Sequence, residues 1–387
     1  MRIGISAPFR MYGGSEVFVR HLLGAWATSG VDRTHAIALL TSHANIDVLG
    51  DAVTDRIEVH PVPYRQTNLL ARLAWEQYTL PRRLGRKDLD VLLCPGNMSP
   101  LGSPIPSVVI FRNAAPFCTS VTLRSAGAYD WTRFQMLGAL MRASARSATR
   151  VVFISRYFRD LFAREYGFPI ARGDIVYNGR DGLSFDAPDP ELLRSLGIQQ
   201  PYFLSVGHLY HYKRFPTLVD GWARASGARS GGRQLVFAGG TLGSPDHARI
   251  VRRIEEHALF ESVRLVGPQP HRVVGQLMAG CDGFVFQSTC ENCPNALIEA
   301  LAAGVPIACS NVGVMPEIAG DAAIYFDPTD PEDVARALDR LADDGPARTE
   351  LRARARSQAE RFPTWDEVGS LVLDSLMRAV ASRATST

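Results

Sequence analysis

The sequence predicts an α/β protein made of two Rossmann-like domains. Three observations lead to this prediction: the length, an alternation of short apolar runs with amphipathic stretches, and a restart of that alternation after a polar segment. With 387 residues the chain exceeds the ~250–300 residues at which a single hydrophobic core stops growing. Hydrophobic residues make up 46% and charged residues 21%, which is ordinary for globular proteins. Each half is therefore expected to bury its own core.

The first half alternates expected strands with expected helices. The clearest amphipathic stretches are residues 16–28 and 131–148. Such alternation is typical of parallel sheets with helical crossovers. The strands expected in this half are residues 2–6, 36–40, 91–94, 107–111 and 150–154.

The same pattern restarts after a polar, proline-containing stretch at residues 181–200. We therefore expect a first domain at 1–184 and a second at 185–364. The last segment, 365–387, contains a helical stretch that could stay in the second domain or cross back to the first. The strands expected in the second domain are residues 202–206, 234–238, 263–266, 283–287 and 305–309.

The two halves carry opposite charge. Residues 1–181 contain 22 basic and 14 acidic side chains, whereas the remainder contains 20 and 25. This asymmetry indicates that the first half meets an anion, such as phosphate or a membrane surface; the alternative is a surface that is merely kept soluble. Only two of the basic residues are lysines, Lys87 and Lys213.

The beginning of the chain is predicted to be a strand and not a signal peptide. No apolar run approaches the ~18 residues that a membrane-spanning helix needs. We expect a cytoplasmic protein whose membrane contact, if any, is peripheral.

Ligands of open parallel sheets bind beyond the carboxyl ends of the strands, which directs attention to four loops. The first contains Gly13 and Gly14, between the first expected strand and a helix. Adjacent glycines allow a ligand to approach the backbone, and the free N–H groups of the following helix can hold phosphate. The alternative is an ordinary strand-to-helix turn.

The second loop follows the strand at 202–206 and contains Gly207, His208, Lys213 and Arg214. Gly207 permits close approach of a ligand, and the two cations could neutralise a diphosphate leaving group. The alternative is a solvated loop with histidines satisfied by packing.

The third loop gives the strongest signal, because Glu291 and Glu299 are separated by seven residues and an Ala-Gly-Val-Pro string follows. Glu291 is expected in a loop and Glu299 within a helix that starts near Pro294. One carboxylate can hold sugar hydroxyls while the other binds a ribose.

The fourth loop follows the strand at 107–111 and contains Arg112 and Asn113. These two residues are expected to face a cleft between the domains. The alternative is a loop packed by Phe117.

Residues 291–306 resemble the E-x7-E signature of the retaining GT-B glycosyltransferases of family GT4. Segments similar to other motifs of this family occur in the same order: 13–16, 152–155, 176–179, 207–213, 311–317 and 325–328. The resemblance implies the GT-B fold, two Rossmann-like domains facing across a cleft. It also implies a hexose-type transfer from a nucleotide diphosphate sugar to a saccharide or lipid-linked acceptor, in cell-surface polysaccharide or glycoconjugate synthesis.

The resemblance further implies a role for each matching residue. Glu299 would bind the ribose hydroxyls, Glu291 the transferred sugar, and Lys213 the diphosphate, with Glu291 and Lys213 acting in catalysis. Gly13 and Gly14 would approach the diphosphate from the first domain. Amides of the segment Asn292, Cys293, Pro294 and Asn295 would meet sugar and phosphate.

Two positions depart from the family pattern. His208 follows Gly207 where the family often has arginine, and Arg214 could substitute for it. Arg112 and Asn113 stand where the family often has a histidine near the reacting sugar. We expect these two residues on the acceptor side.

The expected chemistry needs no cofactor and no divalent metal, because no DxD-like pair lies in a suitable loop. Nucleic acid is not an expected partner. Two other functions stay open on the same architecture: a nucleotide-sugar 2-epimerase, and a non-catalytic nucleotide-sugar-binding subunit that supports a partner.

Overall fold

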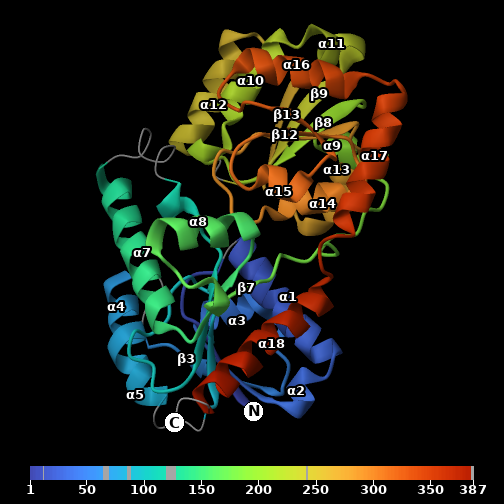
Figure 1. Ribbon diagram of the computed structural model, residues 1–387. Helices are drawn as coiled ribbons and strands as arrows, with labels where there is room; N and C mark the ends of the chain where they lie inside the picture. The colour runs from blue at the N-terminus through green and yellow to red at the C-terminus, as the bar shows by residue number, and fades with distance from the viewer. Residues whose placement is uncertain (12, 64–68, 85–88, 119–127, 241–242, 385–387) are drawn as a thin grey trace. The chain divides into compact units, whose positions relative to one another are not determined.

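The computed structural model describes residues 1–11, 13–63, 69–84, 89–118, 128–240 and 243–384 (Figure 1). These residues form two compact units, each built on a parallel sheet. Of the described residues, those up to 179 belong to unit 1 together with those from 363 onward, and residues 180–362 belong to unit 2. The division thus falls five residues before the expected boundary at 184, and the C-terminal segment belongs to unit 1.

Unit 1 contains a seven-stranded parallel sheet in the order β3-β2-β1-β4-β5-β6-β7. The central strands are buried along their whole length, so their sequences are nearly continuous apolar runs. The strands are β1 (Arg2–Ala7), β2 (Ala36–Thr41), β3 (Ile57–Pro61), β4 (Val91–Cys94), β5 (Ser107–Phe111), β6 (Arg150–Phe153) and β7 (Gly173–Ile175).

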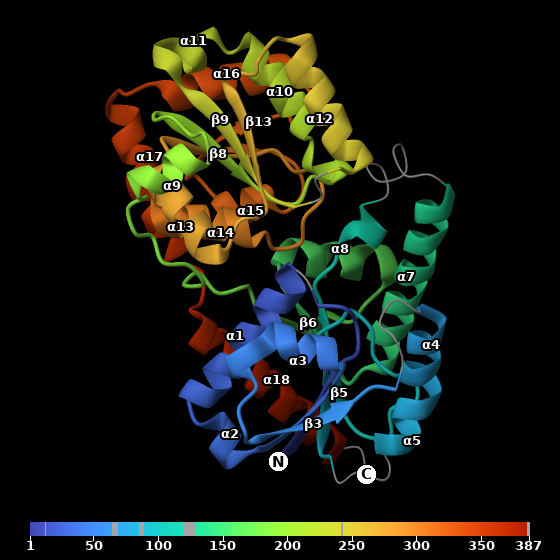
Figure 2. The same ribbon diagram turned by 180° about the vertical axis from the view of Figure 1, so that it is seen from behind.

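Helices cover the sheet of unit 1, as Figures 1 and 2 show. The longer ones are α1 (Gly14–Thr28), α7 (Ala128–Ser147), α8 (Arg156–Tyr166) and α18 (Trp365–Ala384). The shorter ones are α2 (Val31–Thr34), α3 (His43–Leu49), η1 (Gly50–Ala52), α4 (Leu69–Ala74), η2 (Trp75–Thr79), α5 (Leu80–Leu84), η3 (Ala115–Phe117) and η4 (Ile170–Arg172).

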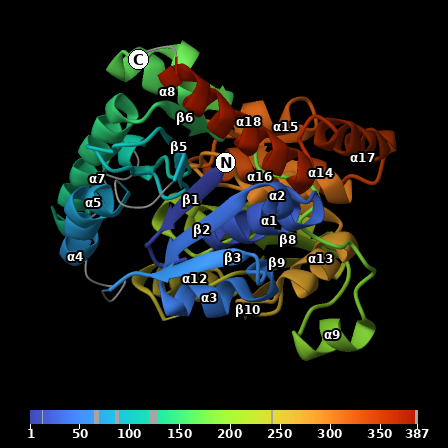
Figure 3. The same ribbon diagram turned by 90° about the horizontal axis from the view of Figure 1, so that it is seen from below.

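The C-terminal helix α18 lies beside α1 and against β4, β5 and β6 (Figure 3). Trp26 of α1 donates a hydrogen bond of 2.9 Å from its indole N–H to the carbonyl of Gly369. The indole of Trp365 stacks on the ring of His21, with centroids 4.6 Å apart. Helix α18 therefore packs into the core of the first domain.

Unit 2 contains a six-stranded parallel sheet in the order β10-β9-β8-β11-β12-β13. Its strands are β8 (Tyr202–Val206), β9 (Gln234–Ala238), β10 (Val263–Gly267), β11 (Gly283–Phe286), β12 (Ile307–Ser310) and β13 (Ala323–Phe326). One apolar core under α10 (Phe215–Arg224) and α16 (Pro331–Ala342) joins Trp222 and Leu338 to the strand residues Phe203 and Phe237.

The other helices of unit 2 vary in length. They are α9 (Pro190–Ser195), η5 (His211–Lys213), α11 (Ser226–Arg229), η6 (Ser230–Gly232), α12 (Pro245–Glu256), α13 (His271–Gly280), α14 (Asn295–Ala303), α15 (Met315–Ala319) and α17 (Pro346–Ala359). Figure 2 shows α10 and α12 neighbouring each other on one face of the sheet.

Several elements differ from the sequence-based expectation. The edge strands β3 and β7 were not expected, and α9 lies inside the stretch that was interpreted as a linker. Both strands lack the fully buried pattern of the central strands. An edge strand pairs on one side only, so its sequence carries a weaker apolar signal.

Candidate active site

Both sheets reverse their strand order at one point, between β1 and β4 in unit 1 and between β8 and β11 in unit 2. Chains leaving adjacent strands in opposite directions open a crevice at the carboxyl ends, where ligands of such sheets bind. The loop after β8 carries Gly207, His208 and Lys213, and the loop after β11 carries Glu291. Two of the predicted site segments therefore border the same switch point.

Lys213 and Glu291 meet across this switch point. The Lys213 Nζ lies 2.5 Å from Oε1 of Glu291, and the two side chains are only 12% and 15% exposed. The ammonium also lies 4.8 Å from the centre of the Phe286 ring. Gly207 leaves room for the lysine stem: its φ is 153°, and a Cβ there would lie 3.4 Å from Nζ.

Hydrogen bonds hold the two loops together. The Ser205 hydroxyl donates to Oε1 of Gln287 at 3.0 Å, in the buried layer beneath the loops. Thr289 donates to the carbonyl of Tyr212 from its backbone N–H at 2.8 Å and from its hydroxyl at 2.9 Å. The turn that carries Lys213 is thereby fixed to the loop that carries Glu291.

His208 occupies the position that follows Gly207 in this loop. Its Nδ1 is buried without a hydrogen-bond partner in the described part of the chain. Burial, and secondarily the charge of Lys213, lower the pKa of the imidazole from its ordinary value. His208 is therefore neutral near pH 7 and adds no charge to Lys213 in the absence of a ligand.

Helix α14 begins directly after the Glu291 loop. Asn292, Cys293 and Pro294 are buried, and Pro294 is the N-cap residue, which supplies no capping side chain. Asn295 is the first helical residue, as the sequence predicted for a helix starting near Pro294. The amino end of α14 carries the positive end of the helix dipole, which favours an anion or a sugar oxygen.

Glu299 lies in the middle of α14 and is 8% exposed. Among the described residues it has no hydrogen bond or ion pair, and burial raises its pKa to about 7. Burying a carboxyl group without a hydrogen-bond partner destabilises the fold, because the group loses its hydrogen bonds to water. Such a group is suited to accept hydrogen bonds from the hydroxyls of a ligand.

Arg214 is oriented differently from Lys213. Its backbone is left-handed, with φ 53° and ψ 29°, and it stands at the N-cap position of α10. Its side chain lines a separate cavity between α10 and α12, together with His211 and Arg249. The side chains of the adjacent residues Lys213 and Arg214 therefore lie in different surroundings.

In unit 1, Arg112 connects two of the predicted loops. Its Nη2 donates to the carbonyl of Gly14 at 2.7 Å, and its Nη1 donates to Oδ1 of Asn178 at 3.3 Å. The guanidinium also lies 4.3 Å from the centre of the Phe18 ring. Gly13, with φ 54°, is the N-cap residue of α1. The glycine loop and the loop after β5 thus form one structure at the carboxyl edge of the sheet.

Asn97 organises this edge and was missed by the sequence analysis. Its Oδ1 accepts hydrogen bonds from the backbone N–H groups of Arg112, at 2.6 Å, and Asn113, at 2.8 Å. Its own φ is 69°, a region that asparagine tolerates better than most residues. Asn97 could have been recognised as a site residue from its position just after β4, the strand that pairs with β1 at the switch point.

Over the described ranges, no group of three or more His, Cys, Asp or Glu side chains is arranged to hold a metal ion. None of the helices in those ranges combines the length and the hydropathy that crossing a bilayer requires.

Family models match both halves of the chain. Residues 12–181 match the model described as glycosyltransferase family 4, and residues 188–360 match the one described as glycosyl transferases group 1. A curated relative, 2-deoxystreptamine N-acetyl-D-glucosaminyltransferase of Streptomyces fradiae, is 24% identical over 97% of this chain and 91% of its own length. O-antigen chain mannosyltransferase B of Escherichia coli is 36% identical, over 27% of each chain.

Solved structures share the fold over nearly the whole chain. Anabaena Alr3699/HepE in complex with UDP and glucose has a TM-score of 0.74 at 16% identity, covering 98% of this chain and 100% of that one. WaaG, a glycosyltransferase involved in lipopolysaccharide biosynthesis, has a TM-score of 0.72 at 18% identity, covering 97% and 99%.

Proposed function

The chain belongs to the GT-B glycosyltransferases of the GT4 kind, and we propose that it transfers a hexose-type sugar from a nucleoside diphosphate donor with retention of anomeric configuration. The observation that carries this proposal is the pairing of Lys213 with Glu291 across the switch point of unit 2. The cation is suited to bind the diphosphate of a nucleotide sugar, and the neighbouring carboxylate is suited to bind the hydroxyls of its sugar. The solved relative that binds UDP and glucose supports the choice of donor class.

The charges of the reaction explain the roles that we assign. Breaking the anomeric bond leaves positive charge on the sugar and negative charge on the departing diphosphate. Lys213 and the amino end of α14 would stabilise the diphosphate, because both present positive charge at fixed positions. Glu291 would hold hydroxyls of the transferred sugar and Glu299 those of the ribose. Front-face attack, with a diphosphate oxygen taking the acceptor proton, would retain the configuration.

For the acceptor we propose a saccharide or a lipid-linked saccharide in cell-surface polysaccharide or glycoconjugate synthesis. The relatives' names refer to an aminocyclitol, O-antigen chains and lipopolysaccharide. Arg112 and Asn113 are the acceptor-side candidates, because Asn97 fixes their backbone at the carboxyl edge of unit 1.

We further propose that unit 1 makes peripheral contact with the cytoplasmic side of an anionic membrane. The segment that contains α4, η2 and α5 exposes Leu70 by 76% and Tyr78 by 66%, and it also exposes Arg82 and Arg83. Apolar side chains beside arginines suit an interface of acyl chains and anionic headgroups. Cosedimentation with vesicles containing anionic phospholipid tests this, and Leu70→Asp with Tyr78→Ser should abolish the binding.

Transfer is proposed to be independent of divalent metals, since Lys213 already supplies a cation for the diphosphate. Activity should therefore survive dialysis against EDTA. A loss of activity that Mg²⁺ or Mn²⁺ restores would refute this part of the proposal.

The proposed function is tested by incubating the protein with nucleotide sugars, UDP-glucose first, and a panel of saccharide and lipid-linked acceptors. Proton NMR of the product should show the anomeric configuration of the donor. Glu299→Ala and Lys213→Ala should each lose transfer while the protein stays folded by circular dichroism. Full activity in both variants would refute the site assignment.

The same assay separates the two alternatives. A 2-epimerase would convert UDP-GlcNAc into its epimer without an acceptor. A non-catalytic subunit would bind nucleotide sugar, as a raised melting temperature would show, but would neither hydrolyse nor transfer it.

A further inference from the structure

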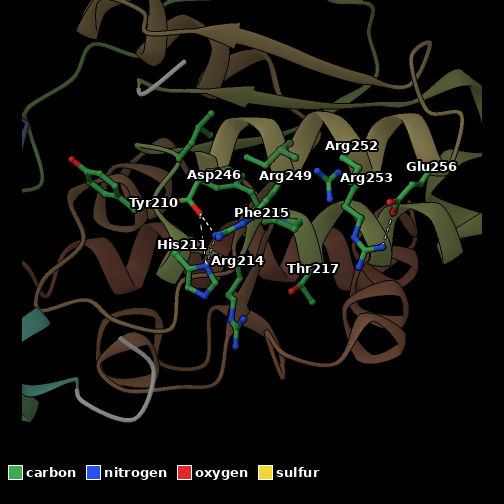
Figure 4. Close-up of a pocket in the computed structure, with 13 residues that line it drawn as sticks. Tyr210, His211, Arg214, Phe215, Thr217, Asp246, Arg249, Arg252, Arg253 and Glu256 are labelled. Carbon is green, nitrogen blue, oxygen red and sulfur yellow. Dashed lines mark hydrogen bonds and ion pairs between the residues drawn. The ribbon is translucent and has the colours of Figure 1, made fainter. Parts of the chain in front are cut away.

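A basic cavity lies in unit 2, between α10 and α12. Its volume is about 380 Å³, and Figure 4 shows side chains from both helices and from the loop before α10 around it. The charged residues of its wall carry an excess of positive charge, since they comprise four arginines and two acids: Arg214, Arg249, Arg252, Arg253, Asp246 and Glu256. The Lys213–Glu291 pair is not part of its lining.

Arg214 has a backbone conformation and a helix position that are unfavourable for arginine. Left-handed backbone is unfavourable for a residue with a side chain, and the N-cap position favours Ser, Thr, Asp or Asn. An arginine there also adds a positive charge to the positive end of the helix dipole. Its Nε is buried without a hydrogen-bond partner in the described part of the chain. Strained residues of this kind are concentrated at active sites and ligand-binding sites.

The groups around Arg214 can bind an anion. Helix α10 has no capping side chain, so the N–H groups of Phe215 and Thr217 in its first turn are available. Arg252 has no hydrogen bond or ion pair among the described residues. Arg249 donates to Asp246 at 2.8 Å and lies 3.3 Å from Nδ1 of His211.

The far end of the cavity is less basic. Arg253 is paired with Glu256 at 2.7 Å, and the Thr217 hydroxyl lies on the opposite helix (Figure 4). A carboxylate and a hydroxyl can bind the hydroxyl groups of a ligand. A cavity of this volume also exceeds what a phosphate ion fills and falls in the range used by small organic ligands.

We propose that this cavity is a binding site, distinct from the donor site, for a small phosphorylated sugar. Its phosphate would lie against Arg214, Arg249 and the first turn of α10, and its hydroxyl-bearing ring toward Thr217 and Glu256. The phosphate could belong to a free sugar phosphate or to a phosphorylated saccharide chain, which present the same chemistry.

This site would be coupled to the donor site through one turn of the chain. His211 and Lys213 belong to η5, and Arg214 follows directly. An occupant that fixes His211 and Arg214 would also fix the turn that positions Lys213. Because coupling is reciprocal, the ligand and the donor nucleotide should change each other's affinity by the same factor.

Isothermal titration of the full chain in saturating UDP tests the site, because UDP blocks the donor site. Glucose 6-phosphate should still bind with one-to-one stoichiometry, inorganic phosphate more weakly, and glucose not at all. The double variant Arg249→Gln/Arg252→Gln should lose at least tenfold in affinity for glucose 6-phosphate while its UDP affinity, measured without sugar phosphate, stays unchanged. Arg336→Gln, an exposed arginine on α16, is the matched control.

The titration is repeated without UDP on Lys213→Met, so that the result does not depend on the proposed function. If neither glucose 6-phosphate nor a phosphorylated oligosaccharide binds in either format, or if the double variant binds with undiminished affinity, the site is overturned. Equal affinities for inorganic phosphate and glucose 6-phosphate would overturn the assignment to a sugar. A phosphorylated oligosaccharide that binds where glucose 6-phosphate does not would identify the chain form as the ligand.

Discussion

Lys213 and Glu291 face each other at 2.5 Å, from loops that follow the two strands flanking the switch point of unit 2. Without a ligand, the carboxylate therefore neutralises the cation that we assign to the diphosphate. In the proposed mechanism, the diphosphate of the donor competes with Glu291 for Lys213. The hydroxyls of the donor sugar then donate hydrogen bonds to Glu291. The following predictions depend on this pair and on its neighbours.

Glu291→Gln should separate nucleotide binding from transfer. Removing the carboxylate frees Lys213 and removes repulsion toward a diphosphate, so UDP affinity should rise by roughly fivefold, or about 1 kcal/mol. Transfer should fall by about 10²–10³-fold, the typical loss when a transition-state contact is removed. Titration calorimetry with UDP and initial rates with the donor sugar measure the two effects. A parallel loss of both would contradict the assigned roles.

His208 should couple donor binding to pH. Its pKa is lowered by burial and by Lys213, and a diphosphate beside it would favour the charged imidazole. Binding should then take up a proton, so UDP affinity should increase as pH falls from 8 to 6, by at most about tenfold per pH unit.

The phosphate groups of UDP titrate in the same range, so the comparison is with His208→Asn. Calorimetry in two buffers of different ionisation enthalpy should show fewer protons taken up by this variant. Equal proton uptake by the two proteins would exclude His208 as the linked group.

Glu299 should make the protein less stable as pH rises. Burial raises its pKa from 4.5 to about 7, so the folded state holds a proton that the unfolded state releases. The contribution of Glu299 to the free energy of unfolding is therefore fully present below about pH 4.5 and is lost as the pH rises to about 7. At pH 8 the cost approaches about 3 kcal/mol, and Glu299→Gln should recover most of it.

Urea unfolding at pH 5 and pH 8 measures this effect, with Glu255→Gln on the exposed face of α12 as the control. The gain from Glu299→Gln should be larger at pH 8 than at pH 5. A gain that is equal at both pH values would show that ionisation of Glu299 is not the cause.

Gly179 should be intolerant of a side chain because α18 returns to unit 1 at this point. A Cβ on Gly179 would lie 2.6 Å from Cγ of the Trp365 indole. Gly179→Ala should therefore cost about 1–3 kcal/mol of stability, measured by thermal or urea unfolding.

Gly24→Ala in α1 is the matched control, because nothing lies within 4 Å of the added Cβ. This variant should stabilise the helix by about 0.5–1 kcal/mol. Equal stabilities of the two variants would contradict the packing of Trp365 on Gly179.

The sequence predicted the parts of the fold that are buried from both sides. The runs at β4 and β5 are apolar except for Ser107, because helices cover both faces of the sheet. The strand β7 could not be recognised, since its three residues, Gly-Asp-Ile, are all only partly buried at the edge. Arg150 stabilises it by pairing with Asp174 at 2.7 Å, a contact that no local pattern reveals.

The candidate site was predictable where its residues follow one another along the chain. Glu291 and Glu299 are linked by the helix start at Pro294, so their spacing carries information. Asn97 acts on a loop 15 residues away, through hydrogen bonds that depend on the order of the strands. The direction of Arg214 was equally hidden, because it depends on a left-handed backbone that the sequence does not specify.

The most direct test of the account is the UDP affinity of Lys213→Met compared with that of Arg214→Met. If Lys213 is the cation that receives the diphosphate, Lys213→Met should weaken UDP binding by at least tenfold, and Arg214→Met should weaken it far less. An unchanged UDP affinity in Lys213→Met, with the protein folded, would contradict the central claim.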